Sequence, residues 1–235
     1  MRNIKIKLIL IVVITLFISD ATAQNIQLHY DLGRNAATST VEMFRPDKVG
    51  NTFLCIDMEY TPNVSDAYWE IARELCFWQE TKANWLSLHV EYNGGINAIV
   101  GPYNNAFLGG LTYSGHSKDC SKTWSITASY KAIPRTIGLN GKAQTHNFQI
   151  TGVWNFDFFN RWLSFYGFAD FWREARPWQG TEYIFIAEPQ LWLNLNRIKG
   201  CDKINLSIGS EVELSCNLLD KRFYVLPTVA VKWTL

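Results

Sequence analysis

The most constraining feature of this sequence is a two-residue alternation between apolar and polar side chains. In the stretch 122–130, Trp124, Ile126, Ala128 and Tyr130 alternate with Thr123, Ser125, Thr127 and Ser129. Successive side chains of a β-strand point to opposite faces, so this period predicts strands with one apolar and one polar face. The period recurs at 146–158 and 205–216, and no comparable 3.6-residue stripe follows residue 23. The chain is therefore predicted to be all-β.

The alternation predicts twelve strands, separated by turn sequences such as Asn93-Gly94-Gly95 and Asn140-Gly141. Most of these strands are longer than the roughly 5–6 residues of an average strand in a soluble protein. They match the roughly 9–11 residues that a tilted strand needs to cross a bilayer. An even number of long antiparallel strands is typical of bacterial outer-membrane barrels. The predicted ranges are 25–32, 38–45, 52–60, 68–78, 85–93, 104–114, 121–132, 146–158, 162–174, 183–195, 205–217 and 222–235.

The first 23 residues are predicted to be a cleaved secretory signal peptide. They combine Arg2, Lys5 and Lys7 with the apolar run 8–18 and end on Ala21-Thr22-Ala23. The apolar run is too short to span a bilayer, which needs about 20 residues. The predicted mature chain is thus residues 24–235, one barrel domain.

The predicted mature chain is close to neutral. Removing Arg2, Lys5, Lys7 and Asp20 from 22 basic and 21 acidic residues leaves 19 basic and 20 acidic ones. This balance argues against a nucleic acid polymer as a partner, because such proteins carry a basic face. No later segment is long and apolar enough to form a transmembrane helix.

Charge placement favours a membrane barrel over a soluble β-sandwich, which is the alternative for an alternating chain. In the predicted register the strand carboxylates take the polar face, while large aromatics such as Trp124 and Trp233 take the apolar face near strand ends. Aromatics at strand ends resemble the two girdles of an outer-membrane barrel. The acids assigned to the polar face are Asp31, Glu42, Asp57, Glu59, Glu70, Glu74, Glu91, Asp157, Asp170, Glu174, Glu188, Glu211 and Glu213.

The C-terminal segment also fits a barrel. Alternate residues from Phe223 to Leu235 share one apolar face, as in the terminal strand of outer-membrane barrels, although those barrels usually end on an aromatic residue. Arg73 fits badly, because the register places it on the lipid side in mid-strand at a cost of roughly 2–4 kcal/mol. We expect a β-bulge to turn it inward. Arg173 has the same parity, but its long stem reaches the headgroups from a strand end.

The five cysteines at positions 55, 76, 120, 201 and 216 are odd in number and lack CxxC spacing. This pattern predicts neither a metal knuckle nor a full disulfide framework. A bridge between Cys120 and Cys201 is one alternative, because both lie in predicted turns.

One region resembles a known family. Glu188-Pro189-Gln190-Leu191-Trp192-Leu193, followed by Asn196-Arg197-Ile198 and Leu206-Ser207-Ile208-Gly209, is similar to a strand–turn–strand pattern of the nucleoside-specific channel Tsx family. Gln190 replaces a basic residue of that pattern and Ile208 an aromatic one, and the match is diffuse elsewhere. The segments 40–44 and 56–60 also resemble outer-membrane proteins of Bacteroidetes. The resemblance implies a monomeric twelve-stranded barrel that passes nucleosides.

We predict an outer-membrane channel for small polar solutes, possibly nucleoside-like, which diffuse through an aromatic and acid-lined lumen. Aromatic faces hold planar rings and carboxylates accept hydrogen bonds from hydroxyl and amino groups, while binding stays weak enough for release. The predicted partners are outer-membrane lipid and the solute, and the chain is expected to be a monomer without cofactor or metal. The predicted lumen-lining residues are Glu42, Asp57, Glu59, Glu70, Glu74, Trp85, Tyr166, Phe168, Asp170, Trp172, Glu188, Trp192, Glu211 and Glu213.

Two other functions stay open at this point. Ser87, His89 and Glu91 share one strand face, and outer-membrane lipid hydrolases place a Ser and a His two residues apart on a strand. In those enzymes the order is reversed and the site faces lipid, so catalysis is not the favoured function. The third class is a structural barrel that conducts nothing, with its interior filled by a satisfied hydrogen-bond network.

Overall fold

The computed structural model describes residues 23–98, 101–102 and 105–235. The predicted signal peptide therefore lies outside the described residues, except for Ala23. In the described residues, no helix has the length and apolar character needed to cross a membrane. The chain instead forms β-strands from Ala23 almost to its last residue.

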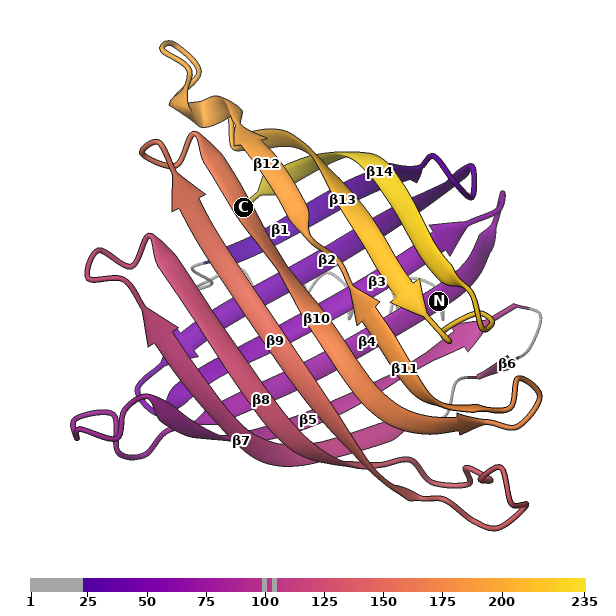
Figure 1. The fold of residues 1–235 in the computed structure, drawn as a ribbon. Coiled ribbons are helices and arrows are strands. Elements are labelled where there is room, and N and C mark those ends of the chain that lie inside the picture. Colours follow the sequence, from indigo (N-terminus) through magenta and orange to yellow (C-terminus); the bar gives the residue numbers. More distant parts are fainter. Residues whose placement is uncertain (1–22, 99–100, 103–104) are drawn as a thin grey trace, which may run out of the picture.

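The described residues form long strands joined in sequence (Figure 1). Their limits agree closely with the alternation in the sequence, and the largest differences lie in the fourth, fifth and tenth predicted ranges. A two-residue strand, β6, and a short 3-10 helix, η1, lie in connections. The elements are β1 (Ala23–Asp31), β2 (Ala36–Asp47), β3 (Gly50–Tyr60), β4 (Val64–Leu75), β5 (Leu86–Asn97), β6 (Gly101–Pro102), β7 (Ala106–His116), β8 (Lys122–Ala132), β9 (His146–Phe158), β10 (Leu163–Arg176), β11 (Thr181–Ala187), β12 (Gln190–Asn194), η1 (Leu195–Arg197), β13 (Leu206–Cys216) and β14 (Phe223–Thr234).

The sheet closes into a barrel because its first and last strands pair. β14 pairs with β1, for example Leu28 with Val231, and every other pairing along the sheet is also antiparallel. β11 and β12 together occupy one position between β10 and β13. Apart from β6, the described strands therefore form a closed twelve-stranded barrel, which confirms the predicted fold class and strand number.

The interruption between β11 and β12 has a local cause. Pro189 lacks a backbone N–H and cannot donate to the sheet, which ends regular pairing there. Gly167 of β10 lies opposite with φ +152°, and a Cβ at this position would collide with the backbone carbonyl of Glu188. The glycine lets the two backbones approach closely, so the barrel wall bends at this point without opening.

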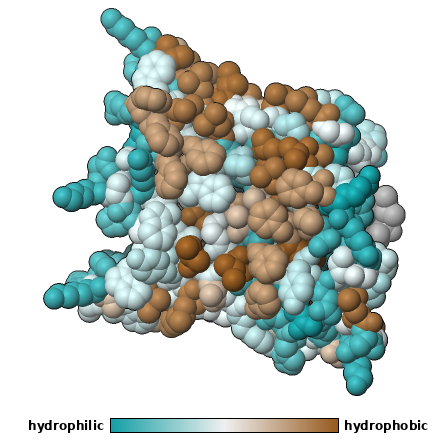
Figure 2. Space-filling model, viewed as in Figure 1, coloured by the Kyte–Doolittle hydropathy of each residue, from teal (hydrophilic) through white to brown (hydrophobic). Residues whose placement is uncertain are grey.

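Along the strands, polar side chains are buried and apolar side chains are exposed, which is the reverse of a water-soluble protein. On β1, Gln27 and Asp31 are at most 1% exposed, whereas Ile26 and Leu28 are about half exposed. Figure 2 shows apolar side chains gathered over the middle of the strands, with hydrophilic side chains toward the strand ends. Leaving one large aliphatic side chain in water costs roughly 1.5–3 kcal/mol, so an exterior of this kind requires lipid around it.

The structure corrects the position of Arg73. β4 ends at Leu75, so Arg73 lies near the end of its strand rather than in the middle. Its guanidinium contacts Asp47 in the adjacent hairpin at 2.7 Å and donates to Thr52 at 3.2 Å. The irregularity between β3 and β4 falls instead at Glu59 and Tyr60. The predicted bulge at Arg73 is therefore wrong, because a rim position already places the charge among polar partners.

The structure also shows the partner of Arg173 and the state of the cysteines. Arg173 lies on β10 and pairs with Glu182 at 2.9 Å, so a carboxylate rather than a headgroup is its partner in the structure. Cys120 and Cys201 are both unpaired, as are the other three cysteines, so the bridge weighed from the sequence is not formed.

Candidate functional site

The polar face of the sheet encloses the barrel interior and carries the predicted lumen residues. Hydrogen bonds and cross-strand pairing place thirteen of the fourteen on this inward face, among them Glu42 of β2, Asp57 of β3, Trp172 of β10 and Trp192 of β12. The others are Glu59, Glu70, Glu74, Tyr166, Phe168, Asp170, Glu188, Glu211 and Glu213.

Trp85 is the exception, and its predicted place in the lumen is wrong. It precedes β5, and its ring packs edge-on against Tyr113 with 5.2 Å between centroids. Thr112 of β7 points inward, so its neighbour Tyr113 points outward. Tyr113 also contacts Trp124. Trp85 thus belongs to the outer aromatic girdle, because the strand begins one residue later than the sequence suggested.

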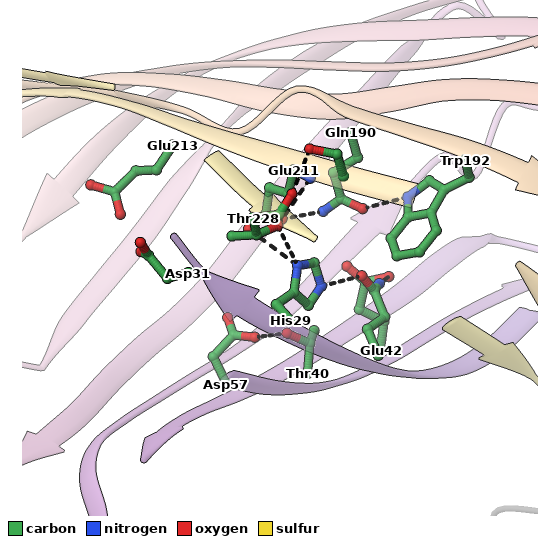
Figure 3. A network of polar contacts seen from close by, with 12 residues as sticks. His29, Asp31, Thr40, Glu42, Asp57, Gln190, Trp192, Glu211, Glu213 and Thr228 are labelled. Carbon is green, nitrogen blue, oxygen red and sulfur yellow. Dashed lines mark hydrogen bonds and ion pairs between the residues drawn. The ribbon is translucent and has the colours of Figure 1, made fainter. Parts of the chain in front are cut away.

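The first polar group in the lumen is centred on His29 of β1 (Figure 3). Its Nε2 lies 2.9 Å from Oε1 of Gln27, and its Nδ1 lies 3.2 Å from the hydroxyl of Thr228 on β14. The Gln27 amide in turn donates to Glu42 at 2.9 Å. We call the group formed by Asn25, Gln27, His29, Glu42, Tyr166, Gln190, Trp192, Glu211, Thr228 and Lys232 the His29 cluster.

The His29 cluster reaches across the lumen. Gln27 on β1 and Lys232 on β14 both contact the hydroxyl of Tyr166 on β10, at 3.5 and 3.0 Å. β10 is not a sheet neighbour of β1 or β14, so these contacts connect separate parts of the wall. Gln27 and Trp192 are 0% exposed, which means that side chains fill the interior at this level. The cluster is therefore a constriction of the lumen.

The second polar group follows the wall formed by β4, β5 and β7. His89 lies between two carboxylates, with Nδ1 2.6 Å from Glu74 and Nε2 3.0 Å from Glu91. Glu74 also accepts hydrogen bonds from Ser87 and Thr112. Because a carboxylate faces each ring nitrogen, both nitrogens must donate, and the ring carries a positive charge. We call Glu74, Ser87, His89, Glu91, Asn93 and Thr112 the His89 cluster.

A third group lies between β8, β9 and β10. Lys131 donates to Gln149 at 2.6 Å, and its ammonium lies 4.7 Å from the centre of the Trp172 ring. Asp170 accepts from Thr151 at 2.5 Å. The inward face of β10 therefore presents Tyr166, Phe168, Asp170 and Trp172 in alternate positions along the lumen.

The turn between β1 and β2 folds toward three carboxylates. The Arg34 guanidinium lies 2.5 Å from Asp31 on β1, 3.0 Å from Glu213 on β13 and 3.7 Å from Glu59 on β3. Burial alone would lower the pKa of Arg34, but the carboxylates of Glu213 and Asp31 raise it above its ordinary value. Arg34 thus links the β1–β2 turn to β1, β3 and β13 through ion pairs.

Carboxylates outnumber basic groups in the lumen. Arg34, Lys131, Lys232 and the charged His89 face a larger set of acids on the same inner surface. Within the described residues, no group of three or more His, Cys, Asp and Glu side chains is arranged to hold a metal ion. The arrangement can accept hydrogen bonds and attract cations, and it offers aromatic faces for stacking.

Sequence reasoning overlooked the neutral amides and Arg34. Gln27 and Gln190 share the parity of the acids on their strands, and that parity was the available signal for them. Gln190 donates to Glu211 at 2.5 Å and accepts from the Trp192 indole at 2.9 Å. Arg34 was assigned to a turn, and nothing in the local sequence shows that this turn folds toward Glu213.

The fold is similar to that of solved outer-membrane porins. The NanC porin structure aligns with a TM-score of 0.60 at 11% sequence identity, covering 91% of this chain and 100% of that chain. Omp33 of Acinetobacter baumannii and OccK11 (OpdR) of Pseudomonas aeruginosa align at TM-scores of 0.43, with 10% and 12% identity. They cover 91% and 89% of this chain, and 97% and 63% of their own.

The similarity to the NanC porin structure concerns the fold, a closed β-barrel. The exposed apolar exterior of this barrel is that of a membrane protein, whereas the nucleoside specificity implied by the Tsx-like resemblance stays a prediction. No curated protein matches the sequence. A family model matches residues 23–235, which is the whole barrel. The chain therefore belongs to the family described as Domain of unknown function (DUF5020).

Proposed function

We propose that the protein is a channel that lets small polar solutes diffuse across the outer membrane. The observation that carries this proposal is an interior lined mainly by polar and acidic side chains, inside an exterior of exposed apolar side chains. Twelve strands enclose a wider lumen than eight strands, which side chains can fill, and a narrower one than the sixteen of large porins. The closed barrel works as a monomer surrounded by lipid in this proposal.

The inner surface indicates which solutes would pass. Excess carboxylates repel anions, so phosphorylated solutes would be excluded and neutral or cationic ones admitted. The rings of Tyr166, Phe168 and Trp172 follow one another along β10. A planar solute would stack on Phe168, or on Tyr166 and Trp172 once it displaces Lys232 and Lys131 from them. A nucleoside has such a ring together with hydroxyl and amino donors for the carboxylates. Nucleosides are accordingly the first candidates to test.

Planar bilayers test the proposal directly. Purified protein should give small, cation-selective conductance steps, and the reversal potential in a KCl gradient reports the selectivity. Liposome swelling with nucleosides, neutral sugars, amino acids and nucleoside monophosphates then defines the solute class. Swelling with nucleosides but not with their monophosphates is the expected result. Silent bilayers, or anion selectivity, would overturn the proposal.

The structure does not support the lipid-hydrolase alternative. The Ser87 hydroxyl donates to Glu74 rather than to His89, and both ring nitrogens of His89 face carboxylates. A catalytic histidine needs a free lone pair to accept the serine proton, and His89 lacks one. The Ser87→Ala variant should therefore leave any lipid hydrolysis by the preparation unchanged.

A non-conducting barrel is the second candidate, and the filled level at the His29 cluster favours it. Gln27, Trp192 and Ser215 are fully buried inside the barrel. In that case the network seals the lumen instead of selecting solutes. Conductance that is absent from the unmodified protein and appears in Trp192→Ala would favour this second candidate.

A further inference from the structure

The His29 cluster contains an ammonium group that contacts two aromatic rings. The Lys232 ammonium lies 4.4 Å from the centre of the Tyr166 ring and 4.5 Å from that of Trp192. The two rings are nearly parallel, with 16° between their planes and 6.3 Å between their centres. Lys232 also donates to the Tyr166 hydroxyl at 3.0 Å. This geometry is that of an aromatic cage for a cation.

The cage is held in place by its surroundings. The Trp192 indole N–H donates to Gln190 at 2.9 Å, and Gln190 donates to Glu211 at 2.5 Å. The ring of His29 packs edge-on against Trp192 at 5.9 Å. Two contacts thus hold the Trp192 ring independently of Lys232, and Glu211 anchors one of the two partners. The cage should keep its shape when the lysine is removed, which is a requirement for binding another occupant.

Burial opposes the charge on the Lys232 ammonium, and the charges of Glu42 and Asp157 offset part of that cost. Glu42 accepts hydrogen bonds from Asn25 and Gln27 at 2.9 Å, so it stays anchored without the lysine. Removing Lys232 therefore leaves the Glu42 carboxyl group without its lysine.

A second lysine ammonium lies over an aromatic ring on the inward face of β10, here over a single ring. Lys131 lies over Trp172, six residues beyond Tyr166, and donates to Gln149 at 2.6 Å. Both aliphatic amines that project into the lumen, within the described residues, thus rest on rings carried by β10. The repetition indicates that the lumen has sites suited to ammonium groups rather than one accidental contact.

We propose that the Tyr166–Trp192 cage is a binding site for the primary ammonium group of organic amines, with Lys232 as its resident occupant. A solute amine would occupy the cage by displacing the lysine side chain, which is flexible and reaches the cage from β14. The passage of amines through the barrel rests on the proposed function. The binding of amines does not, because the site is present whether or not the barrel conducts. It makes small organic amines the solute class that the constriction selects.

Emptying the cage tests the proposal. Lys232→Ala removes the occupant, and n-butylammonium has the length and charge of the missing side chain. Isothermal titration calorimetry of the folded barrel in detergent should show binding of n-butylammonium to this variant. The affinity should exceed that for n-butanol by about tenfold, because a desolvated cation–π contact stabilises the charged amine and not the neutral alcohol of similar shape.

Lys232→Met is the matched control, since it fills the cage without charge. It should bind n-butylammonium about tenfold more weakly than Lys232→Ala does. If folded Lys232→Ala binds the amine no better than n-butanol, or no better than Lys232→Met binds it, the proposal is wrong. Should Lys232→Ala fail to fold, the unmodified protein provides the test, because the proposal requires n-butylammonium to displace Lys232 there. If the unmodified protein binds n-butylammonium no better than n-butanol, the proposal is wrong.

Conductance separates this inference from the proposed function. Silent bilayers combined with amine binding would overturn the channel and leave the ammonium site established. A conducting barrel whose Lys232→Ala variant binds no amine would overturn the ammonium site and leave the channel intact.

Discussion

The two histidine clusters in the lumen use the same residue types to different effect. In the His89 cluster, the partners lie on the adjacent strands β4, β5 and β7, and two carboxylates hold one positively charged ring. In the His29 cluster, the hydrogen bonds of His29 go to the neutral groups of Gln27 and Thr228, and the Glu211 carboxylate lies farther away at 3.8 Å. Gln27 and Lys232 reach β10 across the barrel. One cluster balances charge along the wall and the other fills the lumen.

This difference shows that burial alone does not define a constriction. His29 and His89 are about equally buried, but their clusters differ in reach. Contacts around His29 join β10 to β1 and β14, with at least two strand positions between them, whereas the longest contact in the His89 cluster, from Thr112 to Glu74, skips only β5. A polar network confined to consecutive strands stabilises the wall, whereas one that joins more distant strands narrows the passage. Two experiments compare the clusters directly, and two more test polar contacts elsewhere in the barrel.

The largest expected effect is on conductance. Trp192→Ala removes a fully buried ring from the constriction and should raise single-channel conductance several-fold, because the narrowest level limits ion flow. Thr112→Ala is the control, since Thr112 is equally buried but belongs to the wall cluster. Planar bilayers measure both variants. An equal change in the two variants would remove the distinction between wall and constriction.

The next effect is on stability. His89→Leu leaves Glu74 and Glu91 without their shared cation, and breaking a buried ion pair costs about 3–5 kcal/mol. His29→Leu loses two hydrogen bonds to neutral partners and should cost about 1–2 kcal/mol. Urea unfolding of the barrel in detergent gives both free energies. If His29→Leu is the more destabilised variant, our assignment of charge to His89 is wrong.

A smaller loss is expected at Arg34. Arg34→Gln removes the charge that ties the β1–β2 turn to Glu213, and should lower the free energy of unfolding by about 1 kcal/mol because water screens a partly exposed guanidinium. The exposed Arg45→Gln is the matched control and should change little. Urea unfolding measures both variants. Equal stability of the two would mean that the turn is not held by its ion pairs.

The smallest effect concerns a carboxylate outside the lumen. In the β7–β8 turn, hydrogen bonds from Ser117 and Ser121 lower the pKa of Asp119 to about 2. A lowered pKa means that this group stabilises the fold above about pH 4, and that the contribution is lost as the pH falls toward 2. Ser117→Ala should raise the pKa of Asp119, as measured by carboxyl NMR. An unchanged pKa would show that the Ser117 hydroxyl is not its main partner.

Much of the fold was accessible from local pattern. The alternation at 122–130 and 146–158 recovered β8 and β9 almost to the residue, because side-chain direction in a strand repeats every second residue. The same parity placed the carboxylates inside. Parity failed at Trp85, which lies just before its strand begins, and at Arg73 it gave the correct face but not the position near the strand end. Parity carries no information about where a strand begins or stops.

The alternating pattern is enough to predict long two-faced strands with acids on one face and hydrocarbon on the other. Which inward side chains meet depends on how the barrel closes. Gln27 and Tyr166 are 139 residues apart, and they come together because barrel closure and strand stagger set their levels in the lumen. No local pattern encodes that stagger, so the Tyr166–Trp192 cage and its lysine became visible only in the closed barrel.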